Sequence, residues 1–401
     1  MGWRNCVTYH AEEDNGVSLI CLMKNQMTRA EVAVVGGGIL GLAHAYALAR
    51  RGRQVVLFER GAEARGASVR NFGMIWPIGQ PAGEMHAIAL RSREIWLEIL
   101  NAAGLPYLPT GSLHVAHRKD EAEVLREFAE IGPRAGYTCE WLETDEVLHR
   151  SQAVRPEGLL GGLWSPVEIT VDPRRVLAGL PDYLRTMGVE IRFVTAVRSV
   201  QLPVIETARE RWHVDAAIIC SGEDFETLYP EVFEASGLTR CKLQMMRTAP
   251  QPGGWQLGPA LAAGLTLRFY KAFQICETLA ALRKRVADEM PEYDKWGIHV
   301  LASQTSDGAI TLGDSHEYGA SPEVFDKPEI DELILREAAT FLQLPDPRIA
   351  QRWNGTYAIH PSKPFFEAEA AAGVRIVTAP GGSGMTLSFG LAERVVTRNF
   401  C

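Results

Sequence analysis

Three glycines and one acidic residue form the part of this sequence whose chemistry can be stated first. Gly36, Gly38 and Gly41 form the pattern G-x-G-x-x-G, and Glu59 follows about twenty residues later. The first glycine permits a tight turn, the second lets the backbone approach a pyrophosphate, and the third lets a helix pack closely. A carboxylate at this distance accepts hydrogen bonds from ribose hydroxyls and repels a 2′-phosphate. The spacing predicts a dinucleotide site without a 2′-phosphate and leaves NAD and FAD open.

The elements expected around these residues are those that a dinucleotide site needs. Val32–Val35 is typical of a buried strand, Ile39–Arg51 of a helix ended by Gly52, and Val55–Phe58 of a second strand. The helix directs its free N–H groups and the positive end of its dipole toward phosphates. Because this strand–turn–helix–strand order gives the glycine pattern its meaning, a turn without a ligand is disfavoured.

A second glycine-rich turn opens a helix near the end of the chain. The expected strand Val374–Thr378 leads into 380–384, and a helix is expected over 385–398. A helix N-terminus directed at the N1–C2=O edge of a flavin stabilises the anionic reduced ring. One glycine turn serves the pyrophosphate of any dinucleotide, whereas this second turn favours FAD over NAD.

Two further segments are expected to face such a ligand. The irregular loop 64–80 is too long for an ordinary connector and too rich in apolar side chains for disorder. Its Ala67 and Ser68 can donate to phosphate oxygens. The strand expected over 213–220 ends in Ser221 and a glycine, at the carboxyl edge of a parallel sheet where ligands bind.

Composition and length describe an ordinary globular protein with room for two domains. The chain has 401 residues, a net charge of −8 and no long basic run, which argues against a nucleic-acid partner. No apolar run approaches the roughly eighteen residues of a membrane span, so no membrane partner is expected. Seven cysteines form no C-x-x-C pair, which argues against a disulfide framework or a metal site and favours a reducing cytoplasm.

The central part of the chain changes character. Between Cys241 and Trp353, segments with polar alternation, among them 264–273, predict an antiparallel sheet with one ligand-facing side. The predicted fold is therefore α/β, with a Rossmann-type FAD-binding domain and a smaller antiparallel-sheet substrate domain. The predicted segments are an N-terminal extension 1–26, FAD-binding segments 27–107, 165–240 and 361–401, and substrate-domain segments 108–164 and 241–360.

The sequence resembles the glycine oxidase and D-amino-acid oxidase (DAO-type) family of FAD-dependent oxidoreductases. The resemblance covers nearly the whole chain from Ala30 and rests on VVGGGILGLAHAYALARRGRQVVLFER, GASVRNFGM and GGSGMTLSFGLAERV together. It implies a glutathione-reductase-like FAD domain made of discontinuous segments. No cysteine or histidine matches a covalent flavin anchor, so the resemblance implies non-covalent FAD. The implied FAD contacts are Gly36, Gly38, Ile39, Leu40, Gly41, Glu59, Arg60, Ala67, Ser68, Asn71, Phe72, Gly73, Met74, Val197, Ser221, Gly222, Gly381, Gly382, Ser383, Gly384, Met385 and Thr386.

One departure from the family changes the expected substrate. Members that oxidise amino acids carry an arginine, in a strand of the type R-W-x-G-x-R-P, that forks the substrate carboxylate. Here the strand is RWNGTYAIHP, with Tyr357 at that place, which argues against a plain α-amino acid. The segments SVRNFGMIWPIGQ and GDSHEYG resemble a branch associated with phosphonate catabolism, which implies a small aminophosphonate. The candidate substrate-binding residues are Arg268, Tyr270, Lys271, Tyr357, His316, Met74 and Trp76, and the positioning candidates are Tyr270, Tyr357 and His316.

The resemblance implies oxidation of a C–N bond. A small neutral amine, such as 2-aminoethylphosphonate or its N-methyl derivative, loses a hydride equivalent, the imine hydrolyses to an aldehyde, and O2 becomes H2O2. Three alternatives stay open at this point. They are an oxidase of sarcosine, glycine or a D-amino acid, an FAD dehydrogenase with another electron acceptor, and a flavin-binding protein without turnover.

Overall fold

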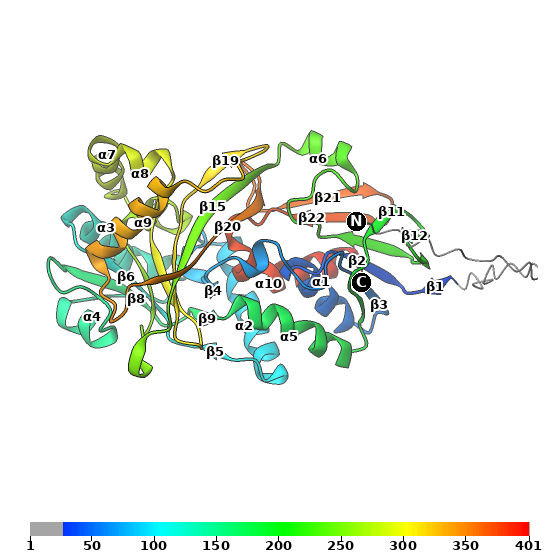
Figure 1. Cartoon of the computed structure of the whole chain (residues 1–401), viewed down its shortest axis with the longest axis horizontal. Helices are drawn as coiled ribbons and strands as arrows, with labels where there is room; N and C mark the ends of the chain where they lie inside the picture. Colours follow the sequence, from blue (N-terminus) through cyan, green and yellow to red (C-terminus); the bar gives the residue numbers. More distant parts are fainter. Residues whose placement is uncertain (1–26, 401) are drawn as a thin grey trace, which may run out of the picture.

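The computed structural model describes residues 27–400, so the predicted extension 1–26 and Cys401 lie outside the described residues. Two large β-sheets lie toward opposite ends of an elongated molecule, with helices between and around them (Figure 1). One sheet has six strands and is mainly parallel, and the other has nine strands and is mainly antiparallel. This arrangement matches the predicted α/β class, although the antiparallel sheet has more strands than the parallel one.

The six-stranded sheet is parallel apart from its edge strand β21, which is antiparallel to β22. Its central strands are short apolar runs because helices or other strands cover both of their faces. In spatial order the strands are β10 (Glu190–Arg192), β3 (Val55–Phe58), β2 (Val32–Val35), β14 (Ala216–Ile219), β22 (Val374–Thr378) and β21 (Phe366–Ala371).

Four helices form one hydrophobic core with this sheet (Figure 1). Gly390 allows two of them to approach closely, because a Cβ at this position would lie 2.2 Å from the carbonyl oxygen of Ile88. The helices are α1 (Ile39–Ala49), α2 (Glu84–Ala103), α5 (Pro173–Thr186) and α10 (Gly384–Asn399).

Two smaller sheets accompany the six-stranded one. A four-stranded sheet contains β1 (Thr28–Arg29), β13 (Arg211–His213), β12 (Val204–Thr207) and β11 (Val197–Gln201). A three-stranded sheet contains β4 (Met74–Ile75), β9 (Ile169–Val171) and β5 (Tyr107–Leu108). The short helix α6 (Pro230–Ser236) precedes β15.

The nine-stranded sheet is antiparallel except where β16 pairs with β6. Its strands are β19 (Glu317–Gly319), β15 (Thr239–Thr248), β18 (Ile310–Gly313), β17 (Leu301–Gln304), β16 (Ala260–Ala262), β6 (Ser112–Ala116), β8 (Gly161–Ser165), β7 (Glu140–Leu142) and β20 (Ile349–Ile359), the last paired with β15. The helices at this end are α3 (Lys119–Ile131), α4 (Thr144–Arg150), α7 (Leu279–Glu289), α8 (Pro291–Lys295) and α9 (Pro328–Phe341).

The prediction of a strand over 264–273 is wrong. This segment forms two 3₁₀ helices, η5 (Gly264–Arg268) and η6 (Lys271–Ile275). Its alternation of apolar and polar residues fits a strand, but β16 already fills the position between β6 and β17. The chain therefore turns away from the sheet after Ala262.

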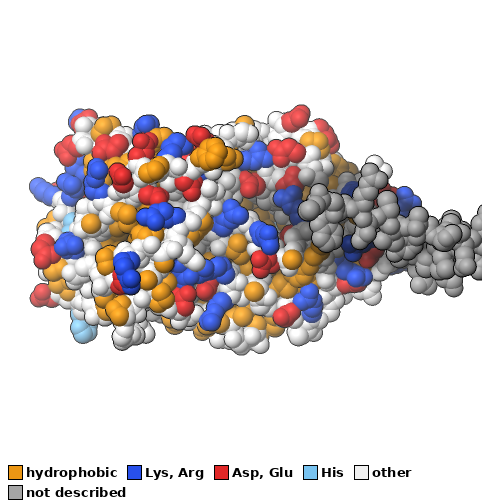
Figure 2. Space-filling view, in the orientation of Figure 1, with side chains coloured by type: hydrophobic (Ala, Val, Ile, Leu, Met, Phe, Trp, Pro, Cys, Tyr) orange, Lys and Arg blue, Asp and Glu red, His pale blue; other side chains and the backbone are white. Residues whose placement is uncertain are grey.

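The surface of Figure 2 shows acidic, basic and hydrophobic side chains interspersed over the face that Figure 1 presents. Within residues 27–400, no helix is both long and apolar enough to cross a membrane. The predicted domain boundaries stay a prediction, although the strands of the six-stranded sheet do come from three separate parts of the chain, 32–58, 190–219 and 366–378.

Candidate functional site

A cavity of about 910 Å³ lies between the carboxyl edge of the parallel sheet and the antiparallel sheet. Strands β2, β14 and β22 are neighbours in register, so their carboxyl ends meet at one edge. Gly36, Ser221 and Ala379, which follow these strands, all line the cavity. Leu243 and Tyr357, from β15 and β20, line it from the antiparallel sheet. The carboxyl edge of a parallel sheet is where α/β folds bind their ligands.

The first glycine turn has the backbone that its sequence predicts. Gly36 has a φ of +108°, and a Cβ there would lie 2.3 Å from the carbonyl oxygen of Cys220. A Cβ at Gly41 would lie 1.8 Å from the carbonyl oxygen of Gly36, so this glycine lets α1 begin against the turn. Gly38 precedes α1 and has no side chain to cap the helix, and the Ser68 hydroxyl accepts a hydrogen bond from the Ile39 N–H. The remaining N–H groups of the first turn of α1 are therefore available to an anion at the cavity.

Glu59 organises the same region. One carboxylate oxygen accepts a hydrogen bond from the Gly37 N–H at 2.7 Å, and the other accepts one from the Gly61 N–H at 2.7 Å. The carboxylate thus holds the glycine turn beside the end of β3. Lone pairs remain on both oxygens, so the predicted bonds with ribose hydroxyls can be added to these two.

The second glycine turn places another helix end at the cavity. Gly381 has a φ of +57°, and α10 begins after Ser383 without a side-chain cap. The Ser383 hydroxyl accepts a hydrogen bond from the Gln80 side chain at 2.9 Å, and Thr386 accepts one from the Trp76 N–H at 2.9 Å. Two helix N-termini therefore face one cavity. This fits a ligand that has a pyrophosphate at one position and an electron-rich ring edge at another.

The loop 64–80 is held in place by its own polar groups. Asn71 donates to the carbonyl oxygens of Ala67 and Ser68, at 2.9 Å each, and accepts from the Gly73 N–H at 2.8 Å. The Ser68 hydroxyl accepts from the Ile39 N–H at 3.0 Å. The loop is thereby tied to the first turn of α1.

The predicted FAD contacts come together at this cavity, with two exceptions. Gly41 packs against the first glycine turn, and Gly73 packs against β9, where a Cβ would lie 1.9 Å from the carbonyl oxygen of Val171. All the other predicted FAD contacts line the cavity. Their direct contact with FAD stays a prediction.

The predicted substrate residues also gather at the cavity, except for one. Tyr270, Lys271, Tyr357, His316, Met74 and Trp76 line it. Arg268 does not, because its side chain is only 9% exposed, pairs with Asp294 and donates to the carbonyl oxygen of Ile298. The 3₁₀ turn at the end of η5 directs this arginine toward α8 and not toward the ligand. In this structure the arginine therefore links η5 to α8.

Lys271 and Tyr357 bring polar groups to the cavity from two different elements, η6 and β20. Lys271 is exposed, and no carboxylate of residues 27–400 lies within ion-pair distance of it. The Tyr357 hydroxyl lies close to the second glycine turn, 3.6 Å from where a Cβ on Gly382 would be. Burial raises the pKa of Tyr357 well above its ordinary value, so its phenol stays neutral and can donate a hydrogen bond.

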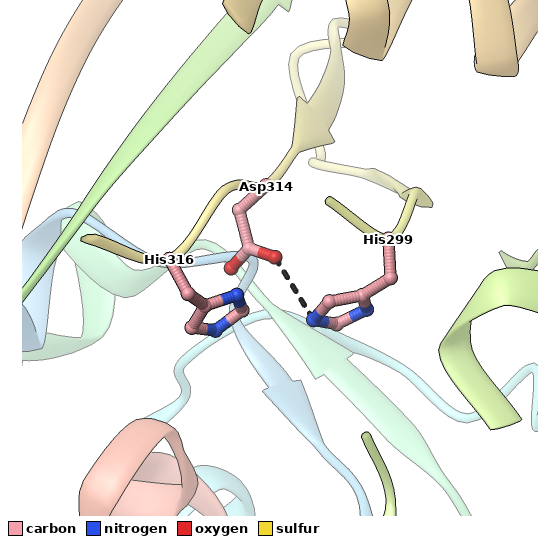
Figure 3. Close-up of side chains that lie close together, drawn as sticks. All are labelled: His299, Asp314 and His316. Atoms are coloured by element: carbon pink, nitrogen blue, oxygen red, sulfur yellow. Dashed lines mark ion pairs between the residues drawn. The ribbon is translucent and has the colours of Figure 1, made fainter. Parts of the chain in front are cut away.

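Sequence reasoning missed two residues of a polar cluster in the cavity wall. His299, Asp314 and His316 each offer one nitrogen or oxygen atom, and these atoms lie within 4.8 Å of one another. Figure 3 shows the Asp314 carboxylate beside both imidazole rings, with His299 Nε2 at 3.1 Å from Asp314 Oδ1. Such a cluster can hold a cation, whether a metal ion or a protonated amine. The sequence signal that could have identified Asp314 is its position two residues before the predicted His316.

Burial sets the charges in this cluster. It raises the pKa of Asp314 to about 6 and lowers that of His299 well below its ordinary value. At neutral pH Asp314 is therefore ionised and His299 is neutral. The Phe269 ring stacks on His299 with a centroid separation of 4.3 Å and an interplanar angle of 23°.

The fold and the site together define a dinucleotide-binding protein of the α/β class. The profile of the family described as DAO, FAD dependent oxidoreductase, matches residues 31–398, and the chain belongs to this family. Glycine oxidase from Geobacillus kaustophilus (strain HTA426) is 26% identical over 206 residues, which are 48% of this chain and 55% of that protein. The matched region thus spans about half the length of this relative.

Solved structures show the same fold. Glycine oxidase from Bacillus cereus ATCC 14579 superimposes with a TM-score of 0.73 at 18% identity, over 92% of this chain and 94% of that one. L-alpha-glycerophosphate oxidase from Mycoplasma pneumoniae, a structure with FAD bound, superimposes with a TM-score of 0.71 at 18% identity, over 94% and 96%. The predicted fold class, the family and the cofactor are confirmed. Bound FAD supplies a ring that accepts a hydride equivalent from the substrate.

Proposed function

We propose that this protein is an amine oxidase for a small aminophosphonate, such as 2-aminoethylphosphonate or its N-methyl derivative. The C–N bond is oxidised to an imine, water converts the imine to an aldehyde, and O2 is reduced to H2O2. The similarity to glycine oxidase supports a small amine as the substrate class. The likeness to a phosphonate-catabolism branch, carried by 68–80 and 313–319, supports the phosphonate.

Position 357 is the observation that carries the choice of anion. Amino-acid-oxidising relatives in this family place a forked arginine there, which matches the two oxygens of a planar carboxylate. This chain places the Tyr357 phenol there, beside the second glycine turn. Lys271 and Tyr270 line the same cavity. One mobile ammonium group and two hydroxyls suit the tetrahedral, dianionic phosphonate better than a carboxylate.

The residues of the chain position the substrate and exclude water. Met74 and Trp76 form buried apolar wall next to Tyr270, whose ring lies 6.3 Å from the Trp76 ring. Such a wall limits the orientations of a small substrate and keeps the reacting carbon out of water. The four cysteines of residues 27–400 carry free thiols, which supports a location in the reducing cytoplasm. They are Cys139, Cys220, Cys241 and Cys276.

Anaerobic bleaching of the flavin absorbance near 450 nm tests the proposed substrate. The panel contains 2-aminoethylphosphonate, its N-methyl derivative, glycine, sarcosine and several D-amino acids. We expect an aminophosphonate to bleach the flavin fastest. Faster bleaching by glycine or sarcosine would identify an oxidase like the relative from Geobacillus kaustophilus, and preference for a D-amino acid would contradict the inference from Tyr357.

Two further readouts separate the remaining alternatives. Stopped-flow mixing of the reduced protein with air reports the electron acceptor, and slow reoxidation would identify a dehydrogenase that uses another carrier. A yellow protein that no amine bleaches would be a flavin-binding protein without turnover.

A further inference from the structure

We propose that Asp314, His299 and His316 form the subsite that binds the substrate's protonated amino group and takes up its proton. This inference rests on the proposed function, in that the substrate is an amine. In the step, an N–H bond of the ammonium group breaks and an O–H bond forms on the Asp314 carboxylate. The products are a neutral amine, as oxidation of the C–N bond requires, and a neutral carboxylic acid.

Backbone pairing places these side chains together before any ligand arrives. Strands β17 and β18 are antiparallel neighbours, with Leu301 opposite Gly313. The ladder continues beyond the strands, because the Asp314 N–H donates to the His299 carbonyl oxygen at 2.8 Å and the His299 N–H donates back at 3.3 Å. Asp314 and His299 are therefore held opposite each other, and His316 follows two residues later. A binding site on paired strands is rigid and preorganised.

Each of the three side chains has an atom that can accept a hydrogen bond, and two of these atoms, Asp314 Oδ1 and His299 Nδ1, are buried. Nδ1 of His316 lies 2.9 Å from the Gly297 carbonyl oxygen. A carbonyl oxygen can only accept, so Nδ1 carries a hydrogen, and Nε2 is the ring nitrogen that accepts in this tautomer. Asp314 Oδ1 and His299 Nδ1 have no hydrogen-bond partner among the described residues. The contact of 3.1 Å between Asp314 and His299 is thus close but poorly directed.

Asp314 is also a buried carboxylate without a strong cationic partner. It is 6% exposed, and within the described chain no lysine or arginine lies within ion-pair distance of it. Burying an unpaired carboxylate is costly, so such a group is usually stabilised by binding a cation or by taking up a proton. An ammonium group is a cation and can also donate a proton.

Position in the cavity favours the amine as that cation. Five acidic residues line the cavity among those described. Four of them, Glu59, Glu63, Glu223 and Asp224, follow β3 or β14 of the parallel sheet, where FAD is expected. Asp314 follows a strand of the antiparallel sheet, together with the predicted substrate residues Tyr357 and His316.

Two matched pairs of ligands test the subsite without turnover. In 2-amino-2-methylpropylphosphonate the carbon that bears nitrogen has no hydrogen, so this amine binds but cannot be oxidised. In 2,2-dimethylpropylphosphonate a methyl group replaces the amino group at nearly the same volume. The carboxylate pair is 2-aminoisobutyrate and pivalate. Isothermal titration calorimetry of the oxidised holoenzyme gives the ratio of the two dissociation constants within each pair.

We expect the wild-type protein to bind the amino member of its preferred pair at least about tenfold more tightly than the methyl member. Asp314→Asn keeps the shape of the side chain and removes its charge, so the ratio falls to about one while binding of the methyl member is unchanged. His316→Gln, at a half-buried position, reduces the ratio partly and carries the test if Asp314→Asn does not fold. Asp288→Asn, an exposed position on α7, keeps the wild-type ratio.

Four outcomes would overturn the proposal. The wild-type protein could show no amine preference with either pair, or a preference could survive both variants. The variants could also lose affinity equally for both members of a pair. Finally, a stoichiometric metal ion could be present whose removal by a chelator changes the ratio as the variants do. An amine preference within the carboxylate pair alone would support the subsite and contradict the aminophosphonate, which separates the two proposals.

Discussion

Asp314 and Lys271 lie in the wall of one cavity, and neither meets a strong partner of opposite charge within residues 27–400. A ligand that carries both a cation and an anion satisfies both groups at once. Aminophosphonates and amino acids are such zwitterions, and the proposed function takes Tyr357, in place of a forked arginine, to favour the phosphonate. At the scale of residues, the proposed substrate thus rests on two unpaired charges and one substitution.

The pKa of Asp314 predicts how binding of the amine depends on pH. Because this pKa is raised to about 6 by burial, the carboxyl loses its charge below about pH 6. Calorimetric affinity for 2-amino-2-methylpropylphosphonate should therefore weaken as pH falls through 6, whereas affinity for the methyl analogue follows only the phosphonate. In Asp314→Asn this difference between the two ligands should not depend on pH.

Other titratable groups near Asp314 determine the controls for this profile. They are Tyr270, Tyr318, Tyr357, Cys241, His299 and His316. Burial raises the pKa of the three tyrosines and of the cysteine and lowers that of His299, so these five stay neutral through this range. His316→Gln measures the contribution of the remaining histidine. A profile that is unchanged in Asp314→Asn but lost in His316→Gln would contradict the assignment to Asp314.

The same carboxyl should cost stability at neutral pH. Its pKa is raised from an ordinary 3.8 to about 6, so the folded state binds the proton more tightly than the unfolded chain. The free energy of unfolding therefore falls as pH rises from about 4 to about 6 and remains lower above. At pH 8 the free energy of unfolding of Asp314→Asn, measured by urea denaturation, should exceed that of the wild type by roughly 1–3 kcal/mol. Equal stabilities at pH 5 and pH 8 in the wild type would contradict this linkage.

Lys271 is predicted to act on the anionic end alone. Lys271→Met should weaken binding of both phosphonate ligands by about tenfold, because one charge-assisted contact is lost. The ratio between the amino and methyl ligands should not change, which distinguishes this residue from Asp314. Lys284→Met, on the exposed face of α7, is the matched control. A changed ratio in Lys271→Met would show that the two subsites are not independent.

At the scale of elements, helix ends and glycines determine where the ligand can lie. Helices α1 and α10 both begin at the cavity, and α10 packs closely against α1 and α2. The position of the second glycine turn therefore depends on how α10 lies on its neighbours. The packing of α10 against α1 and α2 thus positions the N–H groups at the N-terminus of α10.

Gly390→Ala tests this close packing. The added Cβ would lie 2.2 Å from the carbonyl oxygen of Ile88, so α10 must move away from α2. We expect a loss of about 1–3 kcal/mol in the free energy of unfolding, together with weaker FAD binding. Gly319→Ala is the control, because the nearest atom to its Cβ would be 3.9 Å away. Unchanged stability in Gly390→Ala would mean that the helices adjust without cost.

At the scale of the whole molecule, the cavity joins segments that lie hundreds of residues apart. Gly36, Ser221 and Gly381 reach it from the parallel sheet, and Asp314 and Tyr357 reach it from the antiparallel sheet. A ligand that contacts this wall links the two large sheets. Cofactor binding and global stability should therefore be coupled.

Thermal unfolding of the apoprotein with added FAD measures this coupling. At a free FAD concentration one hundred times the dissociation constant, the stabilisation should be about 2.7 kcal/mol, seen as a rise in Tm that grows with FAD concentration. NAD is the control, because it lacks the ring that the second helix N-terminus is expected to meet. An equal rise in Tm with NAD would contradict the selectivity for FAD.

Local patterns in the sequence determined the cofactor part of the site. The predicted bounds of Val32–Val35, Val55–Phe58 and Val374–Thr378 agree with the structure. Apolar periodicity, glycine turns and helix starts act over a few residues, so they are visible in a single sequence. The preference for FAD and the edge of the sheet that faces the ligand followed from these patterns, whereas the family followed from the resemblance.

Only the tertiary structure decided which side chains of the antiparallel sheet meet. The segment 264–273 forms 3₁₀ helices, because β16 fills the position that a strand would need. As a result, Arg268 points toward Asp294. The tertiary structure also brought His299 to Asp314 by pairing β17 with β18. Strand pairing and the burial that shifts the pKa of Asp314 are long-range, because they depend on every element packed around the position. No spacing within one segment could have shown them.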